Sequence, residues 1–274
     1  MTKQNLIDLH THSTASDGIY NPVELIQIAS SAGIAALGLT DHDSVAGLAE
    51  GIAAAGKYGV ELVPGVEITI LEDQREIHIL GYYPQDRDRL HAELEDIREE
   101  RHSRMKKIVD KLIKQGFEIN LNEVLVEAGP SAPGRLHLAR ILVKKKYVHT
   151  LDEVFKLYLN PDRAAYVPRR LMTLKRAMQL LYSVGAIIVI AHPGIMGKKI
   201  IDRLLPLGLQ GIEVFHPDHS ATQKKLYLHL AQVNGLLITG GSDFHGDREN
   251  TTGYPRHLAI SGSYLNDLKK AAGI

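Results

Sequence analysis

Cysteine is absent from the 274 residues, which excludes disulfide bonds and metal sites built on thiolates. A chain without cysteine fits a reducing compartment, so we expect a cytoplasmic protein. Histidine, aspartate and glutamate are then the strong metal ligands that this sequence offers.

The sequence also lacks an excess of either charge. Lys and Arg together number 32, as do Asp and Glu, so the formal net charge is zero. No overall positive field is available to hold long double-stranded nucleic acid, and we do not expect such a partner.

Long apolar runs are missing as well. No segment approaches the ~18 apolar residues that span a bilayer, and the first residues lack the apolar stretch of a signal peptide. We therefore expect no membrane partner. The length fits one large α/β domain, alone or with an insert, and nothing in the sequence indicates an oligomeric state.

Two histidines one residue apart end the first apolar run. Residues 6–9 lead into His10 and His12, and Asp17 follows closely. Residues two apart on a strand share a face, so both imidazoles can point at one divalent metal ion. By itself the pair fits better with two polar residues where a strand leaves the core.

Apolar segments typical of buried strands alternate with helical patterns along much of the chain. This alternation predicts a parallel α/β sheet or barrel. The expected strands are residues 6–9, 34–39, 60–70, 77–80, 185–191, 211–215 and 235–239.

The third and fourth of these strands are predicted to form a hairpin. Only residues 71–76 separate them, which is too short for a parallel crossover. With Glu72 and Asp73 at the tip, Glu67 would lie directly opposite His78, with Cβ atoms about 4.5–5.5 Å apart. A carboxylate and an imidazole so placed could share a metal ion, although a slip of one residue would separate them.

The pattern becomes helical from residue 86 to residue 163. We interpret this segment as a helical insert that caps the active site, while residues 1–85 and 164–274 form the metal-binding catalytic barrel. Arg135 begins one of the insert helices directly after Gly134. Such helix starts favour anions, because their N–H groups are free and the helix dipole is positive there.

Side chains of ligand type gather at the ends of the expected strands. In barrels of this class, the carboxyl ends of the strands build the active site. Asp243 and His245 follow the last strand, again two residues apart, and we expect them to face the same way. Six of the 14 histidines lie near strand ends, and they are His10, His12, His42, His78, His192 and His245. Together they predict a metal centre.

These residues resemble the motifs of the PHP family of metal-dependent phosphoesterases, named for polymerase and histidinol phosphatase domains. The resemblance runs from about residue 6 to the end of the chain. The matching motifs are Asp8-Leu-His-Thr-His12, Thr40-Asp-His-Asp43, Ala191-His-Pro193 and Ser242-Asp-Phe-His245, with Gly65-Val-Glu67 and Ile77-His78 between them.

The resemblance implies a distorted seven-stranded (β/α)7 barrel with three divalent metal ions in its mouth. Mn2+ is the expected ion, with Fe2+ and Zn2+ as alternatives. By position, the first ion would be held by His10, His12, Glu67 and Asp243. Glu67 would bridge to a second ion, held also by His78 and His192. The third ion would be held by Asp17, His42 and His245.

Ions clustered in this way lower the pKa of a bridging water, so a metal-bridging hydroxide is the expected nucleophile. Three nearby carboxylates could orient the ligand imidazoles, or could equally serve as helix caps and solvated strand ends. These are Asp8, Asp41 and Asp43.

The segments Gly134-Arg-Leu-His137 and Gly211–His219 resemble the branch with nucleoside 3',5'-bisphosphate phosphatases and 5'-3' exonucleases of short RNA. The implied reaction converts a nucleoside 3',5'-bisphosphate to the 5'-monophosphate, or cleaves the 5' end of a short RNA. Arg135 would grip a second phosphate, and His216 or His219 would donate a proton to the leaving oxygen or contact phosphate. The expected substrate-binding residues are Arg135, His137, Arg169, His216 and His219.

Three other functions are compatible with the motifs. Within the enzyme class they are a histidinol-phosphate phosphatase, which should not need the basic helical insert, and a C–N hydrolase of the amidohydrolase type, which should not need Arg135. The third is a non-enzymatic, polymerase-associated or regulatory metal-binding module. The complete set of ligands and the absence of a polymerase region argue against it.

Overall fold

The computed structural model describes residues 5–73, 75–129, 132–168, 171–194, 197–246 and 254–274. The chain divides into two compact units, Met1–Ala92 with Met172–Ile274, and Glu93–Leu171. The boundaries expected from the sequence, after residues 85 and 163, lie a few residues earlier. No helix in the described ranges is long and apolar enough to cross a membrane.

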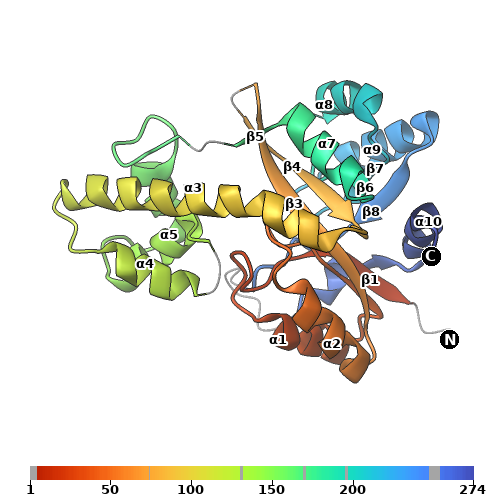
Figure 1. Cartoon of the computed structure of the whole chain (residues 1–274), viewed down its shortest axis with the longest axis horizontal. Helices are drawn as coiled ribbons and strands as arrows, with labels where there is room; N and C mark the ends of the chain where they lie inside the picture. The colour runs from red at the N-terminus through yellow and green to blue at the C-terminus, as the bar shows by residue number, and fades with distance from the viewer. Residues whose placement is uncertain (1–4, 74, 130–131, 169–170, 195–196, 247–253) are drawn as a thin grey trace. The chain divides into compact units, whose positions relative to one another are not determined.

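The first unit is built on one curved sheet (Figure 1). All seven predicted strands are present in the described residues, as β1 (Leu6–Thr11), β2 (Ala36–Leu39), β3 (Glu61–Glu72), β4 (Arg75–Tyr82), β6 (Ile187–Ile190), β7 (Gly211–Phe215) and β8 (Leu237–Gly240). Two strands of two residues each, β5 (Met172–Thr173) and β9 (Ile260–Ser261), were not predicted. The strand order is β8-β7-β6-β4-β3-β2-β1-β9, and β5 pairs with β3.

The two ends of this sheet meet beside β1. The Asp243 N–H donates to the His10 carbonyl, and the His12 N–H donates to the Phe244 carbonyl, both at 3.0 Å. A Cβ added to Gly241 would lie only 2.5 Å from the His10 nitrogen, so the close approach requires glycine there. The sheet is therefore nearly closed, and the predicted α/β barrel fold is confirmed.

Strands β3 and β4 form the predicted antiparallel hairpin, but the predicted register is wrong. Glu67 pairs with Leu80, and His78 pairs with Thr69. Glu72 pairs with Arg75, so the turn lies one residue later than expected, and Asp73 takes a left-handed φ of 50°. Aspartate tolerates that conformation, which two-residue hairpin turns require.

Helices cover the barrel sheet. The first, α1 (Pro22–Ser31), starts at a capping box in which Asn21 and Glu24 bond each other's backbone N–H. The second, α2 (Leu48–Tyr58), ends at Gly59 with a φ of 67°. The others are α7 (Leu174–Ser183), α8 (Gly197–Leu204), α9 (Ala221–Asn234) and α10 (Ser263–Ala272), with short 3-10 turns at Leu205–Leu207 and Arg256–Leu258.

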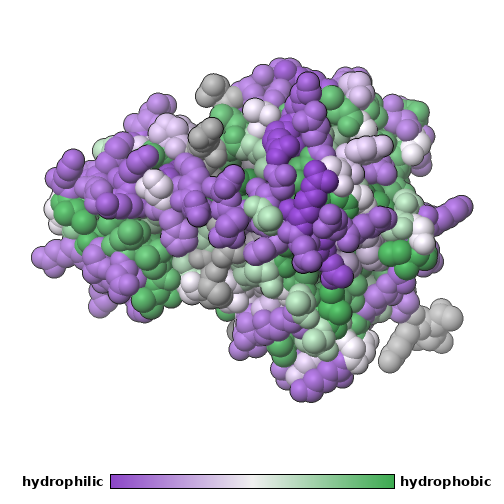
Figure 2. All heavy atoms as spheres, in the orientation of Figure 1, coloured by the Kyte–Doolittle hydropathy of each residue, from purple (hydrophilic) through white to green (hydrophobic). Residues whose placement is uncertain are grey.

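The second unit is helical, as predicted for the insert. Its helices are α3 (Arg87–Ile113), whose first residues belong to the barrel unit, α4 (Leu121–Ala128), α5 (Arg135–Lys144) and α6 (Leu151–Val154), which continues as a π-turn over Phe155–Leu159. Leu112, Val124, Leu138 and Leu142 lie in its own apolar core. Figure 2 shows mainly hydrophilic side chains on the viewed face of α3.

Candidate metal centre

One buried carboxylate, Glu67 on β3, lies at the centre of the histidines. Its Oε1 is 2.9 Å from His78 Nδ1 and 3.0 Å from His192 Nε2. Its Oε2 lies 3.0 to 3.3 Å from nitrogens of three further imidazoles, those of His10, His12 and His42. The side chain is fully buried, so its negative charge is compensated by these neighbours rather than by water.

Four ligand-type atoms converge where β1 meets the end of β8. The Nε2 atoms of His10 and His12 lie 3.1 Å apart, as the two-residue spacing predicts. Asp243 Oδ1 is 3.4 Å from the first of these atoms and 3.1 Å from the second. With Glu67 they form a group whose atoms lie within 4.8 Å of one another, which is the set expected for the first ion.

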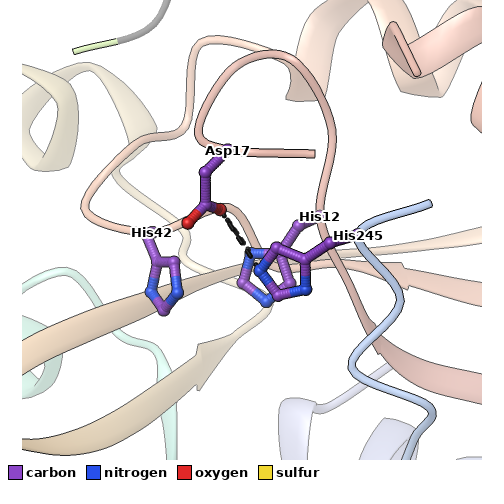
Figure 3. Close-up of side chains that lie close together, drawn as sticks. All are labelled: His12, Asp17, His42 and His245. Atoms are coloured by element: carbon purple, nitrogen blue, oxygen red, sulfur yellow. Dashed lines mark ion pairs between the residues drawn. The ribbon is translucent and has the colours of Figure 1, made fainter. Parts of the chain in front are cut away.

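A second group contains the residues expected for the third ion, and it also contains His12. Its members are His12, Asp17, His42 and His245. Figure 3 shows the Asp17 carboxylate between His42 and the paired rings of His12 and His245. Asp17 Oδ1 is 3.3 Å from His245 Nε2, and the two paired rings stack with centroids 4.1 Å apart.

Asp243 and His245 lie side by side, with Asp243 Oδ1 3.7 Å from His245 Nδ1, although the backbone between them is not an extended strand. Asp243 has a left-handed φ of 52°. This backbone conformation breaks the extended geometry after β8, and the two side chains enter different groups.

The residues expected for the second ion meet at the other oxygen of Glu67. His78 Nδ1 and His192 Nε2 both lie against Oε1 and are 3.3 Å from each other. His78 comes from β4 and His192 follows β6. The antiparallel pairing of these strands brings the start of one beside the end of the other.

His216 approaches the centre as a hydrogen-bond donor. It forms a group with His192 and Asp243. Its Nδ1 accepts from the Asp218 N–H at 3.2 Å, so the neutral ring carries its proton on Nε2. Nε2 lies 3.5 Å from Asp243 Oδ2.

His219 has the opposite arrangement. Its Nδ1 donates to the Val214 carbonyl at 3.0 Å, which leaves Nε2 with a lone pair. Burial lowers the pKa of the ring, so a second proton on Nε2 is disfavoured. Sequence reasoning treated the two histidines as equivalent proton donors. In their neutral rings, however, Nε2 of His216 carries a proton, whereas Nε2 of His219 carries a lone pair.

The chemistry of the centre fits divalent metal ions. Within the described residues, Glu67 Oε2 is buried without a hydrogen bond, although imidazole nitrogens lie within 3.3 Å of it. Burial alone would raise the pKa of Glu67, but the imidazoles of His42 and His78 hold that pKa well below its usual value. An ionised carboxylate among imidazole nitrogens is a donor set that first-row divalent ions prefer once the rings have lost their extra protons.

Asp8 and Asp41 bond backbone and hydroxyl groups that adjoin the ligand histidines, and their orienting role stays a prediction. Asp8 accepts from the His10 N–H at 3.2 Å, from the Ser242 N–H at 2.9 Å and from the Tyr254 hydroxyl at 2.6 Å, so it joins β1 to the segment after β8. Asp41 accepts from the Ser16 hydroxyl at 2.6 Å, and that hydroxyl lies 3.5 Å from His12 Nδ1. Asp43 accepts from the backbone N–H of residue 69 at 2.9 Å, which joins it to β3.

Sequence reasoning missed Glu213 on β7. Its Oε1 lies 2.9 Å from His10 Nδ1, and its Oε2 accepts from the His192 N–H at 2.8 Å. The available signal was an isolated acid inside an apolar strand, which is also the feature that marked Glu67.

The remaining predicted substrate residues belong to the helical unit. Arg135 donates from Nη1 to the Leu159 carbonyl at 3.3 Å, and its guanidinium lies over the Phe155 ring. His137 is buried, and its Nδ1 accepts from the N–H of residue 134 at 3.0 Å. Arg169 lies outside the described residues.

Comparison with known proteins identifies relatives along most of the chain. The model of the PHP domain matches residues 8–157. A 3',5'-nucleoside bisphosphate phosphatase of Chromobacterium violaceum is 36% identical, covering 89% of this chain and 88% of the relative. A 5'-3' exoribonuclease of Haemophilus influenzae is 34% identical, covering 89% and 91%.

A solved structure has the same fold over nearly its full length. It is described as an amidohydrolase from Chromobacterium violaceum, with bound sulfate and no metal. It is 33% identical and has a TM-score of 0.84, covering 97% of this chain and 96% of that one. The motifs, the fold and these relatives agree, and the chain belongs to the PHP family.

Proposed function

We propose that this protein is a metal-dependent phosphoesterase acting on small nucleotides or on the 5' end of short RNA. For the nucleotide, the reaction is removal of the 3'-phosphate from a nucleoside 3',5'-bisphosphate, leaving the 5'-monophosphate. The observation that carries the proposal is Glu67, whose two oxygens face imidazoles from four segments of the barrel. The two relatives named above act on such substrates, according to their names.

The ligand groups fit three divalent ions. The first set is His10, His12, Glu67 and Asp243; the second is Glu67, His78 and His192; the third is Asp17, His42 and His245. Mn2+ is our first choice, and Fe2+ and Zn2+ are the alternatives. Ions held there would make hydroxide available at neutral pH and neutralise the charge of phosphoryl oxygens.

The protein itself supplies a proton donor, His216. In the neutral ring the Asp218 N–H keeps the proton on Nε2, the atom that faces the centre. We assign this N–H to the leaving oxygen or a phosphoryl oxygen of the substrate. His219 is a poorer donor, because its Nδ1–H is engaged by a carbonyl and its lowered pKa opposes a second proton.

Recognition of a second phosphate is assigned to the helical insert, as the cap of the active site. Arg135 stands in the first turn of α5, where free N–H groups and a guanidinium would act together on an anion. His137 and Arg169 are assigned to the same phosphate from the sequence alone. These roles rest on the family motif and on the chemistry of a helix start.

A phosphate-release screen tests the proposal. Protein stripped of metal and reloaded with Mn2+ would be assayed on nucleoside 3',5'-bisphosphates, short 5'-phosphorylated RNA, histidinol phosphate and a chromogenic amide. We expect turnover of the first two classes. Turnover of histidinol phosphate alone, or of the amide alone, would refute the substrate assignment. Full activity of a His10→Ala protein would refute the site.

A further inference from the structure

We infer that Glu213 is a positioning residue of the metal centre, which holds His10 and His192 in place with its two carboxylate oxygens. The inference rests on the proposed metal centre, and it is independent of which phosphate ester is hydrolysed. Glu213 is not itself a proposed metal ligand. It acts through the imidazole of one ligand and the main chain of another.

The contacts are short and wholly buried. Glu213 and His10 are both fully buried, and Oε1 of the first lies 2.9 Å from Nδ1 of the second. Oε2 accepts from the His192 N–H at 2.8 Å. The rings of His10 and His192 stack with centroids 5.7 Å apart and an interplanar angle of 16°. One carboxylate therefore bonds the ring of His10 and the backbone of His192, two residues whose imidazoles approach different oxygens of Glu67.

The hydrogen bond to Glu213 selects one tautomer of His10. A carboxylate only accepts hydrogen bonds, so the ring nitrogen beside it, Nδ1, carries the proton. In the neutral ring, which metal binding requires, Nε2 then keeps its lone pair, and this is the atom that lies among His12, Glu67 and Asp243. Carboxylates that orient metal-binding histidines typically raise metal affinity 10–100-fold.

The chemistry of both partners requires a carboxylate at this position. The two groups that face Glu213 are both N–H donors. A glutamine of the same shape has one acceptor oxygen and one NH2 donor, so it can satisfy one partner and must oppose the other. Glu213→Gln therefore changes the hydrogen bonding with almost no change in volume.

A metal-affinity measurement on the whole protein provides the first test. Metal-free Glu213→Gln would be titrated with Mn2+ against a competing chelator, with circular dichroism to verify folding. We expect affinity to fall about 10–100-fold at the tightest site. The matched control is Gln210→Leu, because Gln210 lies one residue before β7 and its Oε1 bonds the Ile188 N–H of β6, without reaching a ligand. Wild-type affinity in the Glu213→Gln protein would overturn the inference.

The tautomer gives a readout that a purely structural role would not change. In the Zn2+-loaded protein, 15N NMR should show His10 bound through Nε2, with a protected proton on Nδ1. In the Glu213→Gln protein that proton should exchange faster, or Nε2 should lose the metal shift. An unchanged His10 spectrum would also overturn the inference.

A second variant tests the inference if the Glu213→Gln protein does not fold. Glu213→Asp keeps two acceptor oxygens but is one methylene shorter, so it cannot span both partners as Glu213 does. We expect the Mn2+ affinity of this variant to be reduced as well, and wild-type affinity would contradict the inference. Because no step measures phosphate release, an inactive wild-type enzyme would refute the proposed function without deciding the role of Glu213.

Discussion

Glu67 Oε1 lies 2.9 Å from His78 Nδ1, although Leu80 is the residue directly across the hairpin from Glu67. The contact is diagonal, and side chains two positions apart on the partner strand remain on the same face. The other oxygen of the same carboxylate reaches His42, which follows β2. One side chain therefore joins ligands from different strands.

Replacing this carboxylate should empty the centre. Glu67→Gln leaves one acceptor oxygen among five imidazoles, so we expect metal content to fall and kcat/KM to drop by more than the ~100-fold upper range for a residue that only orients a ligand. Elemental analysis after gel filtration and phosphate release measure the two effects. Glu61→Gln is the control, because Glu61 lies on the same strand but pairs with Lys269. Retention of metal and activity by Glu67→Gln would contradict the assignment.

The closure of the barrel should be sensitive to one methyl group. Gly241→Ala would place a Cβ 2.5 Å from the backbone of His10, so β1 and the end of β8 must separate. We expect the free energy of unfolding to fall by about 1–3 kcal/mol, together with a loss of bound metal. In the control Gly56→Ala, the new Cβ meets nothing within 4 Å, and the helix should gain about 0.5–1 kcal/mol. Urea unfolding compares the two, and equal stability of Gly241→Ala and wild type would refute the steric argument.

The sequence predicted those features that depend on short-range periodicity. The two-residue repeat placed His10 and His12 on one face, and the length of the linker required a β3–β4 hairpin. The register failed because it depends on where the turn falls, and Asp73 takes a left-handed conformation that only the folded turn reveals. The error of one turn position moved the pairing by two residues, which preserves the face, so Glu67 and His78 still meet.

Features that depend on contacts with particular partner groups in the folded chain could not be predicted from the sequence pattern. The tautomers of His216 and His219 follow from the Asp218 N–H and the Val214 carbonyl, and no sequence pattern specifies those bonds. Glu213 was visible as an acid in an apolar strand, but its partner on β1 is 203 residues away. Likewise, extended geometry was assumed after β8, where Asp243 adopts a positive φ.

The different roles of the two histidines after β7 predict different mutant phenotypes. His216→Ala removes the N–H that faces the centre, and we expect kcat to fall about 10²–10⁴-fold with little change in KM. His219→Asn keeps a donor near the Nδ1 position for the Val214 carbonyl, so most activity should remain. Steady-state kinetics with His229→Gln, an exposed histidine of α9, as the control would test this. Equal losses in the first two variants would show that the tautomer argument fails.

Arg135 should affect substrates according to their number of phosphates. If its guanidinium grips a second phosphate, Arg135→Ala should raise KM for nucleoside bisphosphates about tenfold or more, as expected when a charged hydrogen bond is lost. Activity on a singly phosphorylated nucleotide should change little. Lys144→Ala, at the other end of α5, controls for the general charge of the helix. The same loss on both substrates would remove Arg135 from this role.

Metal binding should release protons, because expected ligands such as His192 and His245 hold them in the metal-free chain. Burial opposes protonation of His192, but Glu67 raises its pKa to about 9. Burial likewise opposes protonation of His245, yet Asp17 and Asp243 raise its pKa to about 10. Both rings are therefore protonated at pH 7, whereas a metal ion requires neutral imidazole. We expect affinity to rise from pH 7 to about 9–10, and calorimetry in buffers of different ionisation enthalpy would count the released protons.

The same pKa shifts determine how the stability of the metal-free protein depends on pH. Both values lie above that of an unfolded histidine, near 6.5. Their stabilising contribution is thus complete below about pH 6.5, and it is lost as the pH rises through about 9 for His192 and about 10 for His245. The melting temperature of the metal-free protein should fall over that range. The metal-loaded protein should not show this loss, because its imidazoles are already neutral. If the melting temperatures of the two forms changed in parallel between pH 6.5 and 10, the proposal that metal binding displaces the protons of His192 and His245 would be contradicted.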